Sequence, residues 1–112
     1  MNAVNSLVQM IFREGDSIVV EGAVTIDNVV MLTQRGIALF DDQPLTIDLN
    51  KVTKVDSTIV SMLLEWLRAM QKNNQALRVI NMPDSLKSLI QLYGMAELIP
   101  LPASEATLHS AS

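Results

Sequence analysis

Side chains that could do chemistry gather at one junction in the sequence, where a short alternating segment gives way to a long amphipathic one. The residues at this junction are Asp56, Ser57 and Thr58, a carboxylate followed by two hydroxyl groups. At the start of a helix such groups can accept hydrogen bonds from free backbone N–H groups or bind polar atoms of another protein. A hydroxyl can also be phosphorylated.

Three further polar residues continue this candidate site along the predicted helix. Ser61, Glu65 and Arg68 follow at spacings of four and three residues, which places them on one helix face. A partner protein could set polar atoms against them at the centre of an otherwise apolar interface. All six residues are predicted to bind a partner, and none is predicted to be catalytic.

Ser57 has three alternative roles. Together with Asp56 it could simply cap the helix, a contribution of about 1 kcal/mol. It could instead be presented to a docking partner. In the third alternative it is phosphorylated, which adds about −1.5 to −2 charge that the helix dipole tolerates but the Asp56 carboxylate repels. Phosphorylation would then disrupt docking.

A strand and a helix must position the junction. Apolar and polar residues alternate over residues 45–49, which predicts a half-buried strand of about five residues. After a polar connection, the helix should begin at Ser57 or Thr58 and stop at the asparagine pair 73–74. Its core stripe recurs at steps of three and four residues and consists of Ile59, Leu63, Trp66, Leu67 and Met70.

The apolar surface of this helix is wider than a surface helix needs. Val60, Met62 and Leu64 flank the core stripe. They indicate either a deeply packed helix or a helix whose exposed margin receives a partner protein.

An antiparallel strand pair is predicted at the start of the chain. Residues 7–13 and 17–21 are apolar runs separated by Gly15, which can adopt the positive φ of a tight hairpin. Gly22 is predicted to close the second strand.

A helix is predicted to follow this pair and to run through Phe40, capped by Thr25 or Asp27. Gly36 should weaken its last turn, and residues 41–44 form a turn. The expected inward positions are Val29, Val30, Thr33, Ile37 and Phe40.

The sequence of the second half of the chain predicts one more strand and one more helix. The strand covers residues 77–82 and is expected to be buried on both sides. Asp84 or Ser85 would cap the helix, and Gly94 would end it. The apolar residues assigned to this helix are Leu86, Leu89, Ile90 and Tyr93.

The order of elements predicts an α/β fold with a mixed sheet of about four to five strands and about three helices, mainly on one face. The 112 residues suffice for one domain. We expect this domain at residues 1–101, where residues 98–101 form a short last strand or pack on the sheet edge. Residues 102–112 are small and polar, which predicts a flexible C-terminal tail.

Composition excludes several classes of protein. Hydrophobic residues make up 49% of the chain, which excludes a disordered protein, but no run approaches the ~20 apolar residues that span a bilayer. Without cysteine or a signal peptide, we expect a cytoplasmic protein. The net charge of −4, the scattered basic residues and the few aromatic residues argue against nucleic acid as a partner.

An enzyme is not expected. His109 is the only histidine and lies in the predicted tail, and neither of the glycine-rich phosphate-binding patterns occurs. We therefore predict no cofactor and no metal.

Two segments resemble a known family. Residues 47–57 read I-D-L-N-K-V-T-K-V-D-S and open a helix, a pattern similar to the STAS domain of anti-sigma factor antagonists and sulfate-transporter tails. Residues 88–95, S-L-I-Q-L-Y-G-M, with L-I-P at 98–100, resemble the L-A-K-L-Y-N-L ending and terminal L-P of the STAS subunit of the Mla phospholipid transport system, MlaB. The resemblance spans residues 7–101.

This resemblance implies a non-enzymatic module that docks on the cytoplasmic ATPase of an ABC transporter and stabilises it. The transporter moves phospholipid between the membranes of a Gram-negative cell, so the module would be peripheral to the inner membrane only through the complex. The family's functional hydroxyl corresponds to Ser57, and the aspartate before it to Asp56. The alternative is an anti-sigma factor antagonist that a kinase regulates by phosphorylating Ser57.

Overall fold

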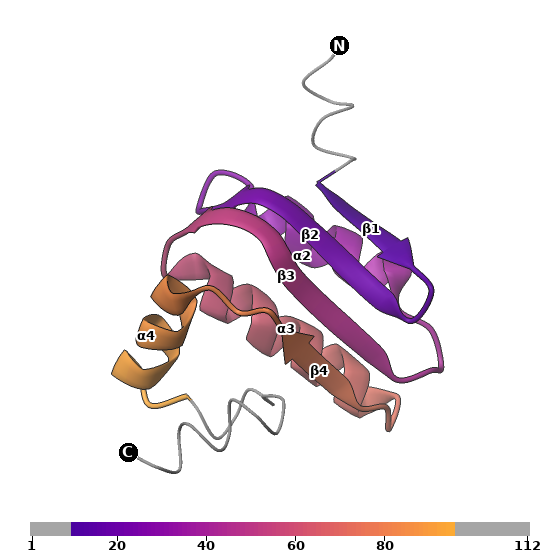
Figure 1. Ribbon diagram of the computed structural model, residues 1–112. Helices are drawn as coiled ribbons and strands as arrows, with labels where there is room; N and C mark the ends of the chain where they lie inside the picture. The colour runs from indigo at the N-terminus through magenta and orange to yellow at the C-terminus, as the bar shows by residue number, and fades with distance from the viewer. Residues whose placement is uncertain (1–9, 96–112) are drawn as a thin grey trace.

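A computed structural model of the protein describes residues 10–95 and places helices against a four-stranded sheet (Figure 1). The order of elements is the predicted one. The expectations for residues 7–9, 98–101 and 102–112 lie outside the described residues. In chain order the elements are β1 (Ile11–Glu14), β2 (Ser17–Val24), α2 (Val29–Leu39), β3 (Leu45–Val55), α3 (Thr58–Lys72), β4 (Leu77–Ile80) and α4 (Asp84–Leu92).

The sheet is mixed, as predicted, with strand order β1-β2-β3-β4. β1 and β2 form an antiparallel hairpin through Gly15, whose φ is +65°, and β3 is parallel to both β2 and β4. Both parallel connections step in the same direction through a helix, so right-handed crossovers put α2 and α3 on the same face. Figure 1 shows both helices behind the sheet.

The core lies between this face and the two helices. Leu45, Ile47 and Leu49 of β3 are buried, as the alternating pattern predicts. The predicted stripe of α3 is buried at Ile59, Leu63, Trp66 and Met70, and Leu67 packs partly against it. Val60 and Met62 on the two flanks are buried as well. Close packing on both sides therefore explains the wide apolar surface of α3.

β3 is longer than predicted. It continues past Leu49 to Val55, because the second half of β2 supplies a backbone ladder for it. The prediction that Gly22 closes β2 is wrong for the same reason. Gly22 has a φ of +84° inside the strand, where the pairing register shifts, so β2 runs on to Val24.

The predicted caps of α2 and α4 are wrong. α2 begins at Val29 after Asn28, and the Thr25 hydroxyl instead accepts a hydrogen bond from the backbone N–H of Asp27. α4 follows Pro83, and no side-chain cap is found there. Gly94 ends α4 with a φ of +66°, as predicted. Tyr93 of the predicted apolar set is 51% exposed, whereas the buried residues of the set are Leu86 and Ile90.

The predicted inward face of α2 is confirmed at Val29 but wrong at Val30 and Ile37. Val30 and Ile37 are 67% and 41% exposed, whereas Val29, Leu32 and Gly36 are buried. These three lie three and four residues apart on one helix face. A hydrophobic pattern cannot reveal this face because glycine contributes no side chain to it.

Gly36 allows α3 to approach α2 closely. A β-carbon at this position would lie 2.4 Å from ring atoms of the Trp66 indole. The indole Nε1 donates a hydrogen bond to the backbone oxygen of Thr33 at 2.9 Å, and Phe40 meets the ring edge to face. Gly36 therefore does more than weaken the helix: it makes room for the largest side chain in the core.

Candidate functional site

The predicted site residues lie at the start of α3 and along its outer face. Asp56 and Ser57 join β3 to α3, and Thr58 is the first helical residue, as predicted. Ser57 is exposed, whereas its two neighbours are half-buried. Further along the helix the exposed residues are Ser61, Glu65 and Arg68. The fold therefore brings the six residues together on one surface.

Asp56, and not Ser57, caps the helix. Asp56 Oδ1 accepts hydrogen bonds from the backbone N–H of Thr58 at 2.9 Å and from the Thr58 hydroxyl. The Ser57 side chain has no hydrogen-bond partner among residues 10–95. Capping therefore explains Asp56 and Thr58, but it leaves the Ser57 hydroxyl available to another molecule.

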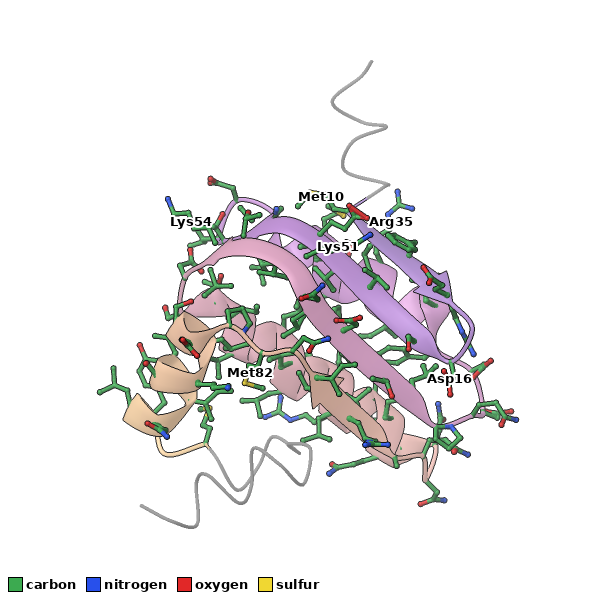
Figure 2. The ribbon with its side chains drawn as sticks, viewed as in Figure 1. Met10, Asp16, Arg35, Lys51, Lys54 and Met82 are labelled. Carbon is green, nitrogen blue, oxygen red and sulfur yellow. The ribbon has the colours of Figure 1, made fainter. Side chains whose placement is uncertain are left out.

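Asp56 also ties α3 to the loop that precedes α2. Its Oδ2 accepts a hydrogen bond from the backbone N–H of Ile26 at 2.9 Å, and its own N–H donates to the Val24 oxygen at 3.2 Å. The Thr58 hydroxyl and then the Ile26 N–H hold the pKa of Asp56 below its usual value of 3.8, with help from the charge of Lys54. Figure 2 shows Lys54 beside this loop.

Replacing Asp56 with asparagine is expected to remove a pH-dependent contribution to stability. A carboxyl whose pKa is lower in the folded state stabilises the fold at neutral pH, and this contribution is lost as the pH falls through the folded value. We expect the variant to melt a few degrees lower than the original protein at pH 7. The two melting temperatures should become equal once the pH is well below 3.8, the usual pKa of an aspartate. Thermal unfolding followed by circular dichroism measures both. A difference that is the same at every pH would contradict this role of the carboxylate.

α2 contributes an apolar border to the site. Its residues were predicted to lie in the core. A hollow of 390 Å³ lies between α2 and α3, and its lining includes Val30 and Ile37 on one side and Ser61 and Glu65 on the other. Ile26, in the loop before α2, is 71% exposed as well. The spacing of Val30 and Ile37 by seven residues was the available signal, because it places them on one face of α2.

A second hollow continues the first toward the end of α3. Its volume is 380 Å³, and it shares Ile37 and Glu65 with the first. Arg68 and Lys72 line its far part. Arg68 and Glu65 form an exposed ion pair, which contributes little to stability but neutralises the middle of the surface. We call the two hollows together the α2–α3 groove.

Neither a metal cluster nor a membrane-spanning helix occurs in the described part of the chain. Within residues 10–95 no group of three or more acidic, histidine or cysteine side chains could hold a metal ion. Over the same residues no helix has the length and apolar character needed to cross a membrane. Of the predicted site residues, Ser61, Glu65 and Arg68 line the α2–α3 groove, whereas Asp56, Ser57 and Thr58, at the junction of β3 and α3, line neither hollow.

Comparison with known proteins places this geometry in context. Residues 11–100 match the model of a protein family described as "Mlab, STAS domain". No curated protein is significantly similar in sequence to this chain.

Solved structures share the fold at low sequence identity. An anti-sigma-factor antagonist (STAS) domain protein from Planctomyces limnophilus has a TM-score of 0.63 and 16% identity, over 91% of this chain and 97% of that one. An anti-sigma factor antagonist from Mycobacterium paratuberculosis has a TM-score of 0.61 and 19% identity, over 91% and 92%. The antagonist SpoIIAA in its unphosphorylated form has a TM-score of 0.58 and 10% identity, over 89% and 93%. At these identities the similarity concerns the fold.

Proposed function

This chain belongs to the STAS domain family, and we propose that it is a non-enzymatic subunit that binds and stabilises the cytoplasmic ATPase of an Mla-type ABC transporter. Such a transporter carries phospholipid between membranes and maintains the lipid asymmetry of the outer membrane. The description of the matching family model supports the transport role. STAS domains generally bind or regulate other proteins, which agrees with a subunit that does no chemistry.

One observation carries the proposal: α3 begins next to a free hydroxyl and continues as one wall of an exposed apolar groove. Ser57 has no side-chain partner among the described residues, and Val30 and Ile37 are exposed beside Ser61. An apolar patch bordered by polar groups is the usual composition of a protein–protein interface. Packing within this chain does not require these exposed side chains, so a partner explains them better.

The six residues have different roles in this proposal. Ser57 and Ser61 contact the partner directly, because their hydroxyls are exposed. Asp56 and Thr58 position the junction, because their side chains bind each other. The remaining two, Glu65 and Arg68, form an ion pair in the middle of the groove. The domain would thus be cytoplasmic and associate with the inner membrane only through the transporter.

A second candidate function uses the same hydroxyl. An anti-sigma factor antagonist would be switched by a kinase that phosphorylates Ser57, which is exposed and free of side-chain partners in the described residues. The shared fold with SpoIIAA agrees with this alternative. A phosphate there would stand next to the Asp56 carboxylate, so it would weaken any docking at the junction.

Copurification distinguishes the two functions. The protein should be coexpressed with the ATPase and permease of the Mla-type transporter from its own organism and purified through a tag on the ATPase. We expect a stable complex, and an ATPase that aggregates sooner when this subunit is absent.

A kinase assay tests the second candidate function. If a serine kinase shifts the protein on a phosphate-affinity gel, Ser57→Ala abolishes the shift and no ATPase copurifies, the antagonist function replaces the transporter function.

A further inference from the structure

The α2–α3 groove is continuous and has the length of a short helix. Its two hollows share Ile37 and Glu65, and the α3 residues that line it run from Ser61 to Asn73. That stretch of α3 is about 18 Å long at 1.5 Å per residue, which matches a partner helix of about 12 residues. Ser61 and Ala69 have small side chains, which leaves the space between the helices open.

The chemistry of the groove changes along its length. In the first hollow it is apolar, with Val30 and Ile37 exposed. In the middle, Glu65 is neutralised by Arg68. At the far end Lys72 is exposed and has no ion-pair partner among residues 10–95. The groove therefore offers an apolar surface that ends in one uncompensated positive charge.

From this gradient we infer that the occupant is an amphipathic helix of the partner with an acidic residue next to Lys72. A groove between two helices accepts the ridge of a third helix, and it has no strand edge at which an extended peptide could pair. Apolar side chains of the partner helix lie against Val30 and Ile37. The inference rests on the proposed function, because it names what the ATPase presents to this surface.

Chemical coupling tests the acidic contact directly. The carbodiimide EDC joins a lysine amine to a carboxylate in contact with it without leaving a spacer. EDC should couple Lys72 to an aspartate or glutamate within a helical segment of the ATPase in the copurified complex. Mass spectrometry of the digested complex identifies the coupled residues. Lys51, an exposed lysine of β3 that lines neither hollow, is the internal control (Figure 2). Coupling of Lys51 but not of Lys72 would overturn the inference.

Charge reversal gives the energetic test. Lys72→Glu should weaken binding to the purified ATPase about tenfold or more, because it replaces an attraction between opposite charges with a repulsion between like charges. Added salt should then weaken the binding of the variant less than that of the wild-type protein, because the attraction that salt screens is gone. Lys51→Glu makes the same change of charge outside the groove and should leave the affinity within about twofold of the original.

Three other outcomes have separate meanings. If the two variants bind equally well while the wild-type protein still captures the ATPase, the inference fails and the proposed function stands. If the wild-type protein captures no ATPase, both fail. If light scattering shows a dimer of the isolated protein that Lys72→Glu dissociates, the occupant is a second copy of this chain and the inference is overturned.

Discussion

Replacing Ser61 with arginine is expected to abolish capture of the ATPase while the protein stays folded. Ser61 is exposed on α3 and lines the hollow that faces Val30 and Ile37. An arginine there would fill this hollow and leave a charge without a partner at the centre of the interface. Substitutions at such central positions weaken binding by about 2 kcal/mol or more, which is roughly 30-fold or more in Kd.

Ser88→Arg is the matched control. Ser88 is an exposed serine on α4 that lines neither hollow, so the same change should leave capture intact. Affinities can be measured with immobilised ATPase, and circular dichroism shows that each variant is folded. Equal affinities of the two variants would show that the partner does not occupy the α2–α3 groove.

Gly36→Ala is expected to destabilise the protein, although alanine favours a helix more than glycine does. The added β-carbon would lie 2.4 Å from the indole of Trp66, which is fully buried and cannot move aside easily. Overpacking of this kind lowers the free energy of unfolding by about 1–3 kcal/mol. Urea unfolding of the two proteins measures the difference.

The same substitution should have the opposite sign once the indole is removed. In a Trp66→Leu background the new methyl group has space, so helix propensity dominates and Gly36→Ala becomes neutral or stabilising by up to about 1 kcal/mol. If Gly36→Ala destabilises both backgrounds equally, close packing against Trp66 is not the reason for the glycine.

The parts of the fold with a clear hydrophobic period could be predicted from the sequence. Leu45, Ile47 and Leu49 alternate as a half-buried strand does, and they are buried. α3 begins at Thr58, and Asn73 follows its last residue, both as predicted. In these segments local preference and tertiary packing agree, so the pattern alone was sufficient.

Prediction failed where a distant segment decides the local structure. β3 extends through polar residues to Val55 because β2 pairs with them, and no local signal announces that pairing. The inward face of α2 was misassigned because it includes Gly36, whose role depends on Trp66 of another helix. Val30 was predicted to lie in the core because the glycine on the true inward face gives no hydrophobic signal, but Val30 lies on the exposed side.

The candidate site could be predicted only on the α3 side. The spacing of Ser61, Glu65 and Arg68 was enough to place them on one exposed face. The apolar border from α2 required the packing of two helices to be known. Which oxygen caps α3 also depended on geometry, because Asp56 and Ser57 are both suitable by residue type.

Site-specific photo-cross-linking in the transporter complex tests most directly whether this surface binds the ATPase. The photoreactive residue p-benzoylphenylalanine would replace Val30, which borders the α2–α3 groove, and separately Lys51, which lies outside it. Docking in the groove predicts a cross-link to the ATPase from position 30 and none from position 51. A cross-link from position 51 alone would show that the partner binds elsewhere on the molecule.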